Sequence, residues 1–415
     1  MLTIAALLAA AFLAQDEPTD MNLDAAAAPG VLQALGDDWP VDDMADWSLR
    51  RRPLLLEMFQ QIVYGRLPAE TGVTALERTP ISVAGIKGAG SAENIRFDLG
   101  PAGRPVHATL ILPKGDGPHP VIMQYAMCGA PLALPGLTEA AAPAGGMPEF
   151  CERFAGMTPP ADDPDPMMID MPVEELLAHG YGMLAFAPGD IVPDDGPAAI
   201  SLLEELSPVD DPKERLGALA AWGWGASRIV DVLEMDERVD QDRIALMGHS
   251  RNGKAAIVAA AYDRRIDLVW IHQSGTGGVT LSRSYEGESV ENITGGFPHW
   301  LAPRFRDYAD HEADLPIDQH QMLALIAPRP VLIGAAYGDT WAGPKGAWLS
   351  AQGADPVYEL LGTEGLNQAS PEAYNPHGQI AYFIREGRHG TSRSDWDRFI
   401  EFLDAHFNAD SGRAY

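Results

Sequence analysis

Three residues in the second half of the chain could together activate a serine for attack on an acyl carbon. Ser250 lies in "MGHSRNGKAA", between the apolar run "RIALMG" and the alanine-rich run "KAAIVAAAY". Asp339 follows a later apolar run, and His389 follows the next. A histidine oriented by a carboxylate takes the serine proton, and the resulting nucleophile attacks an ester or amide carbonyl. The pattern therefore predicts a triad of Ser250, His389 as base and Asp339 as acid.

The surroundings of Ser250 leave two interpretations open. The α/β hydrolases place their nucleophile on a strand-to-helix turn with the signature G-x-S-x-G, and here Gly253 stands one place later than that signature requires. A serine between a strand and a helix is also a good helix N-cap. The chain order Ser, Asp, His is that of the α/β hydrolases and favours the nucleophile. For Asp339 the alternative is a turn residue in "GDTW".

Apolar strands alternate with helical patterns over most of the chain. Antiparallel strands are expected at 94–99 and 106–113, a buried strand at 119–129 and an early helix at 48–68. Further strands are expected at 180–190, 243–248, 266–275, 329–339 and 379–387, and further helices at 214–235, 251–262, 320–328 and 392–407. Such alternation predicts an α/β-hydrolase fold, a three-layer α/β/α sandwich with a mostly parallel central sheet.

The domain organisation predicted from composition is simple. Residues 1–14 fit the apolar region of a signal peptide, with a frayed apolar tail as the alternative, and 15–30 fit a flexible lead-in. Residues 31–415 are expected to form a single catalytic domain with an insertion at about 130–166, rich in Ala, Pro, Gly and Asp. These features predict a secreted or periplasmic protein.

The charge and cysteine content limit the partners and cofactors. The formal net charge of −30 disfavours binding to nucleic acid or to an anionic membrane surface. Cys128 and Cys151 could form one disulfide or remain two buried thiols, and two cysteines alone cannot make a structural zinc site. We expect neither a metal nor a cofactor, and we expect the protein to be a monomer.

Several longer stretches resemble the glucuronoyl esterases of carbohydrate esterase family 15. They are "WGWGASRIVDVLE", "GHSRNGK", "QSGTGGVTLSR", "GESVENI", "FPHW", "LPIDQHQMLALIAPRPVLI" and "GDTWAGPKG". The resemblance covers most of the chain after the lead-in. It implies an α/β-hydrolase fold, a serine mechanism without metal, and cleavage of esters between 4-O-methyl-glucuronic acid on xylan and lignin alcohols.

The same resemblance implies roles for individual residues. Ser250 and His389 match the family's nucleophile and base, and Arg251 matches the arginine that stabilises the oxyanion. The residues implied to bind the sugar are Lys254, Glu288, Trp341 and, from "FPHW", His299. Alternatives are that Arg251 and Lys254 form a solvated first helical turn and that Trp341 belongs to the core.

One position departs from the family pattern. Many members carry their catalytic glutamate at the end of the strand after the elbow helix, where this chain reads "IHQSGTGG" and has Gln273. An amide cannot stabilise an imidazolium as a carboxylate does. Asp339 is therefore expected to supply the acid.

The sequence thus predicts a secreted serine carboxylesterase that acts on glucuronate esters of glucuronoxylan and lignin–carbohydrate linkages. Two alternatives remain open: another carbohydrate esterase, such as an acetyl xylan esterase, and a non-catalytic sugar-binding relative, since fold alone does not fix function.

Overall fold

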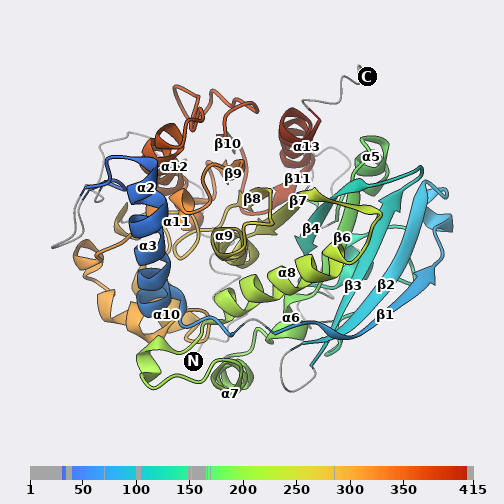
Figure 1. Ribbon diagram of the computed structural model, residues 1–415, viewed down its shortest axis with the longest axis horizontal. Coiled ribbons are helices and arrows are strands. Elements are labelled where there is room, and N and C mark those ends of the chain that lie inside the picture. Colours follow the sequence, from blue (N-terminus) through green and yellow to red (C-terminus); the bar gives the residue numbers. More distant parts are fainter. Residues whose placement is uncertain are drawn as a thin grey trace.

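A nine-stranded sheet in the order β1-β2-β3-β6-β4-β7-β8-β9-β10 runs through the structure (Figure 1). This computed structural model describes the residues 30–33, 40–69, 71–99, 104–147, 151, 165, 167–168, 170–284 and 286–408. The predicted signal peptide at 1–14 and nearly all of the lead-in at 15–30 lie outside the described residues.

The sheet is antiparallel at one edge and parallel elsewhere. The strands β1 (Thr74–Ile81), β2 (Gly90–Leu99) and β3 (Arg104–Pro113), blue to turquoise in Figure 1, form the antiparallel edge, and β3 also pairs antiparallel with β6 (Gly182–Phe186). From β6 onward each pair is parallel, through β4 (His119–Tyr125), β7 (Val239–His249), β8 (Leu268–His272), β9 (Val331–Ala336) and β10 (Ile380–Arg385). The predicted mostly parallel sheet is confirmed.

Helices cover both faces of the sheet because its central, parallel strands are apolar on both sides. In β7, Ile244 and Leu246 face one core cluster while Ala245 and Met247 face the other. The first cluster includes α3 (Arg52–Phe59), α8 (Ala218–Glu234), α9 (Arg251–Tyr262), α11 (Gln319–Ala324) and α12 (Pro344–Leu360). The second includes α4 (Ala130–Ala133), α5 (Val173–Ala178) and α13 (Arg393–Phe407). The predicted three-layer α/β-hydrolase architecture is confirmed.

The remaining described elements are short connections and N-terminal helical turns. They are α2 (Met44–Asp46), η1 (Trp47–Arg51), η2 (Gln60–Tyr64), η3 (Ala84–Ile86), β5 (Met167–Met168), α6 (Pro188–Ile191), α7 (Gly196–Leu206), η5 (Pro212–Glu214), η6 (Ser282–Ser284), α10 (Val290–Gly296), η7 (Pro303–Tyr308), η8 (Glu312–Asp314), η9 (Thr340–Ala342) and β11 (Thr391–Ser392). The predicted early helix corresponds to α2 through η2, which follow one another without a break. No described helix is both long and apolar enough to cross a bilayer.

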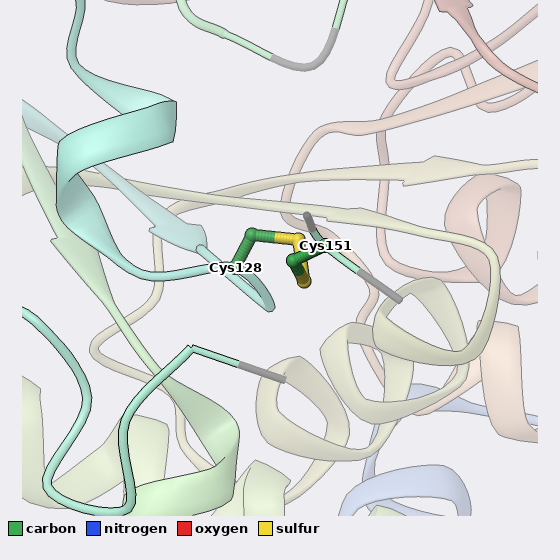
Figure 2. Close-up of a disulfide and its surroundings, with 2 residues drawn as sticks. All are labelled: Cys128 and Cys151. Carbon is green, nitrogen blue, oxygen red and sulfur yellow. A yellow bond between two sulfur atoms is a disulfide. The ribbon is translucent and has the colours of Figure 1, made fainter. Parts of the chain in front are cut away.

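The described start of the predicted insertion packs against the sheet. Leu134 and Leu137 are buried in the second core cluster, and the Ala141 N–H donates to the Thr109 hydroxyl on β3 at 2.8 Å. Cys128 and Cys151 form a disulfide that closes this segment (Figure 2). Of the two interpretations left open for the cysteines, the structure has the disulfide.

The double substitution Cys128→Ala/Cys151→Ala should lower the free energy of unfolding. The crosslink joins residues 23 apart, and restricting a loop of that length in the unfolded chain contributes about 3 kcal/mol. Urea unfolding of the parent and of the double variant, each with and without reductant, measures the difference. Reductant should destabilise the parent only, and equal midpoints for oxidised parent and variant would contradict the prediction.

Candidate active site

Ser250 forms the turn between β7 and α9 at the carboxyl edge of the sheet. Its backbone has φ 58° and ψ −127°, and its N–H donates to the His272 carbonyl at 2.9 Å. The Ser250 side chain caps no backbone N–H of α9. It lines an open pocket instead. The geometry therefore fits a nucleophile elbow and not the alternative helix N-cap.

Two glycines permit the close crossing of strand and helix at this elbow. A Cβ on Gly248 would lie 2.2 Å from the Asn252 carbonyl oxygen. A Cβ on Gly253 would lie 2.9 Å from Ser274 Cβ and 3.0 Å from the Gly248 carbonyl oxygen. The distances of 2.2 and 2.9 Å are too short for a larger residue at either position unless the surrounding atoms move. The late second glycine thus packs against the first one, as the elbow requires.

Asp339 and His389 meet beside the elbow. They follow β9 and β10, which are parallel neighbours, so both loops open at the same edge of the sheet. His389 Nδ1 lies 2.7 Å from Asp339 Oδ2, and the two side chains are 21% and 1% exposed. Both residues line the same pocket as Ser250. A carboxylate on Nδ1 selects the tautomer whose Nε2 accepts a proton.

Gln273 holds the backbone next to His389. Its Oε1 accepts the Gly390 N–H at 2.7 Å and lies 3.2 Å from His249 Nε2. Its φ of 47° is positive, which is uncommon for a residue other than glycine. Gln273 therefore supports the histidine loop, while the carboxylate that contacts His389 is that of Asp339.

A second histidine lies directly behind His389. The rings of His249 and His389 are 4.6 Å apart between centroids. Burial lowers the pKa of His249 well below its ordinary value, and the nearby His389 and His272 lower it further. His249 consequently stays uncharged and adds no positive charge beside the candidate base.

Arg251 is held by a carboxylate and an aromatic ring. Its guanidinium forms an ion pair with Asp194, and its central carbon lies 4.8 Å from the Trp300 ring centroid and 5.7 Å from that of Phe297. Asp194 Oδ1 also accepts the Trp300 indole N–H at 2.7 Å and lies 2.8 Å from His299 Nε2. Arg251 is thus fixed in the pocket wall, unlike a residue of a solvated helical turn.

The start of α9 adds a second source of positive potential. The first N–H groups of a helix have no intrahelical partner and carry the positive end of the helix dipole. In α9 these groups begin at Arg251, directly after Ser250. Backbone donors and a guanidinium beside a nucleophile are suited to stabilising an oxyanion.

Lys254 and Glu288 form a buried ion pair in the pocket wall. Lys254 Nζ lies 2.5 Å from Glu288 Oε2 and donates to the Thr276 carbonyl at 2.6 Å. Burial lowers the pKa of Lys254, and the Glu288 carboxylate opposes that shift. Gly275, with φ +67°, leaves room for the pair, since its Cβ would lie 3.1 Å from Glu288 Oε2.

Trp341 and His299 have different environments. Trp341 lines the pocket and is 38% exposed, so it is not a core residue. His299 is 3% exposed and bonded to Asp194, and it is absent from the described pocket lining. The geometry favours a supporting role for His299 over the predicted contact with the sugar.

Sequence reasoning missed two residues of this wall and the carboxylate that holds Arg251. Phe297 and Trp300 stack with ring centroids 3.7 Å apart, and both line the pocket. Their motif "FPHW" was a usable signal. Asp194 had no signal, because nothing in "VPDDGP" separates it from Asp195. Among the described residues no group of three or more His, Cys, Asp or Glu side chains could hold a metal ion.

The elbow, the Asp339–His389 pair and the mostly parallel sheet define the chain as an α/β hydrolase of the serine ester hydrolase class. A model of the family "Glucuronyl esterase, fungi" matches residues 160–362. A solved glucuronoyl esterase from Solibacter usitatus is 30% identical, with a TM-score of 0.76 over 93% of this chain and 99% of that one. A solved glucuronoyl esterase from Teredinibacter turnerae is 31% identical, with a TM-score of 0.72 over 97% of this chain and 99% of that one. The chain belongs to carbohydrate esterase family 15, and the resemblance predicted from the sequence is confirmed.

The curated relatives are matched over only part of their length. A carbohydrate esterase from an unknown prokaryotic organism is 43% identical over 239 residues, which are 56% of this chain and 55% of that protein. A 4-O-methyl-glucuronoyl methylesterase of Podospora anserina is 27% identical over 335 residues, which are 78% of this chain and 58% of that protein. The chain therefore spans little more than half the length of these two relatives.

A fluorophosphonate should label Ser250, because this reagent reacts with serines that have a working base. Ser250→Ala should abolish labelling. Asp339→Asn should slow it by about 10³- to 10⁴-fold by removing the carboxylate from Nδ1, whereas Gln273→Ala should cost about tenfold or less. Mass spectrometry of the labelled peptide over time gives these rates. Nearly normal labelling of Asp339→Asn together with slow labelling of Glu288→Gln would show that the acid has been wrongly assigned.

Proposed function

We propose that this chain is a serine carboxylesterase that hydrolyses esters of glucuronic acid or 4-O-methyl-glucuronic acid in glucuronoxylan and lignin–carbohydrate linkages. Ser250 is the nucleophile, His389 the base and Asp339 the acid, and Arg251 stabilises the oxyanion. The observation that carries the proposal is the buried Lys254–Glu288 pair in the same pocket as Ser250. Two relatives, a 4-O-methyl-glucuronoyl methylesterase and a glucuronoyl esterase, support the proposal.

The proposed reaction has two acyl-transfer steps. His389 removes the Ser250 proton as the oxygen attacks the ester carbon, and the N–H groups at the start of α9 and the Arg251 guanidinium stabilise the oxyanion. His389 then protonates the departing alcohol, which leaves a glucuronoyl ester on Ser250. A water molecule that gives its proton to His389 hydrolyses this ester and releases glucuronate and free Ser250.

The polar groups of the pocket favour a uronate over an acetate. An ammonium and a carboxylate that are buried together can donate to and accept from sugar hydroxyls. Trp341 offers an exposed aromatic surface beside them, and such surfaces pack well against pyranose rings through their apolar area. An acetyl group has no hydroxyls for these residues, which weighs against an acetyl xylan esterase.

The site also weighs against a non-catalytic relative. A serine with a positive φ costs on the order of 1–3 kcal/mol and persists only where the surroundings enforce it, and here it coincides with a 2.7 Å Asp339–His389 contact. A protein that only binds sugar has no need of either feature.

Export is consistent with this function. Disulfides persist in oxidising compartments, and Cys128–Cys151 is one. Together with the apolar residues 1–14, this supports a secreted or periplasmic enzyme that meets its polysaccharide outside the cytosol.

Benzyl glucuronate should be a better substrate than p-nitrophenyl acetate, when judged by kcat/KM. Lys254→Met should lower kcat/KM for the glucuronate by about 10- to 100-fold, since it removes a charged hydrogen-bond donor, and should leave that for the acetate nearly unchanged. Ser250→Ala is the inactive control for both substrates. Comparable kcat/KM values of the parent for the two esters would favour the acetyl esterase alternative.

Arg251→Ala should reduce kcat by about 10²- to 10³-fold and change KM much less. A group directed at the developing oxyanion acts mainly in the transition state. Steady-state kinetics with benzyl glucuronate separates the two constants. A variant with a normal kcat and a raised KM would show that Arg251 binds the ground state instead.

A further inference from the structure

Each cationic side chain in the described lining of the pocket is paired with a carboxylate. Arg251 pairs with Asp194, and Lys254 pairs with Glu288. Asp339 adds a further carboxylate in the same wall. With His389 neutral, the pocket therefore carries no excess of positive charge, although two cations lie within one turn of Ser250.

This balance matters because the proposed reaction changes the charge of the sugar. The inference here rests on the proposed function. A glucuronate ester is neutral at its carboxyl carbon, whereas the product is a carboxylate that is ionised at neutral pH. An arginine without a counter-ion would bind such a product through paired N–H···O contacts. The product would then occupy the site and compete with the ester.

Asp194 is firmly held as the counter-ion of Arg251. Besides the arginine, it bonds to the Trp300 indole N–H at 2.7 Å and to His299 Nε2 at 2.8 Å. Burial raises the pKa of Asp194, but the Arg251 charge and the bonds from His299 and Trp300 outweigh burial and bring the pKa well below its ordinary value. Asp194 thus remains ionised around neutral pH.

The position of Trp300 further restricts Arg251. The indole donates to Asp194 at its edge, while its ring lies 4.8 Å from the guanidinium carbon. The carboxylate and the ring occupy two sides of the guanidinium. The remaining N–H groups of Arg251 can still donate to the oxyanion, which exists only briefly during the reaction. The negative charge of Asp194 repels the carboxylate of the product, which is fully charged and persists.

We propose that Asp194 is a specificity-determining residue that makes this pocket prefer the neutral ester to the uronate anion. It does so by neutralising Arg251 next to Ser250. The consequence is weak product inhibition, and the residue is a positioning residue for Arg251 rather than one that contacts the reacting atoms.

The experiment compares the binding of a neutral and an anionic sugar of the same shape. Methyl glucuronate and glucuronate are titrated calorimetrically into Ser250→Ala and into Ser250→Ala/Asp194→Asn, so that no turnover occurs. Asp194→Asn should raise the affinity for glucuronate about tenfold, the equivalent of one charge-assisted hydrogen bond, and change that for methyl glucuronate by less than about twofold. In the active background, Asp194→Asn should show correspondingly stronger inhibition by glucuronate.

Control variants separate charge compensation from a purely structural role. Asp194→Glu keeps the charge and should restore the parent's ratio of anion to ester affinity. Glu174→Gln removes an exposed carboxylate that pairs with Lys87, outside the described pocket lining, and should leave the ratio unchanged. Should Asp194→Asn fail to fold, as circular dichroism would show, Asp194→Ser provides a second removal of the charge.

The possible outcomes distinguish this inference from the proposed function. An unchanged ratio in folded Asp194→Asn, or an equal loss of affinity for both sugars, overturns the role of Asp194 while the parent still hydrolyses glucuronate esters. Failure of Ser250→Ala to bind either sugar, with no turnover by the parent, overturns the proposed function and this inference with it.

Discussion

The crossing of β7 and α9 sets the geometry on which the whole pocket depends. Gly248 and Gly253 bring the strand and the helix so close that Ser250 between them adopts a positive φ. Sheet and helix packing on both sides enforces this backbone, whose cost is on the order of 1–3 kcal/mol. The same crossing directs the first turn of α9 at the pocket, so Arg251 and Lys254, three residues apart on one helix, both line it. One local constraint thus places the proposed nucleophile, the proposed oxyanion donors and the cation that we propose to bind the sugar.

Much of this arrangement could be predicted because local sequence patterns determine it. The helix predicted over 251–262 is the α9 that the structure has, and the five strands expected from 180 to 387 all appear. Four of them are shorter than predicted, whereas β7 extends beyond 243–248 at both ends. The long helix α12 was missed because "PKGAWLSAQGADPVYEL" contains two glycines and Pro356, which are poor helix formers. Its Gly353 serves the packing of α12 on α11, where a Cβ would lie 2.9 Å from His320 Cβ. Tertiary contact therefore overrides local propensity there.

In the candidate site, too, some residues could be predicted from local patterns and others could not. Ser250, Asp339 and His389 follow strands, and strand ends of a parallel sheet share an edge, so chain order suffices to predict that they meet. Asp194 and Trp300 lie far apart in sequence, and neither follows a sheet strand directly. Their contact with Arg251 depends on how the loops after α6 and α10 pack against each other, which no local pattern encodes. The same reason explains His299, which the family resemblance implied to bind the sugar and whose surroundings make it a partner of Asp194.

The distribution of charge around His389 explains how Gln273 can stand where the family resemblance led us to expect a glutamate. Gly390 needs an acceptor for its N–H, and the Gln273 amide oxygen supplies one at 2.7 Å. A carboxylate at that position would also accept this bond, but it would be a second buried negative charge beside the imidazole, in addition to Asp339. Burying another carboxylate carries a desolvation cost that a nearby cation would have to offset, and His249 cannot offset it because burial keeps that ring neutral. Asp339 alone supplies the negative charge beside His389, so residue 273 has only to hold the loop that carries His389 and Gly390. The neutral amide of Gln273 does this without the cost of burying a second carboxylate.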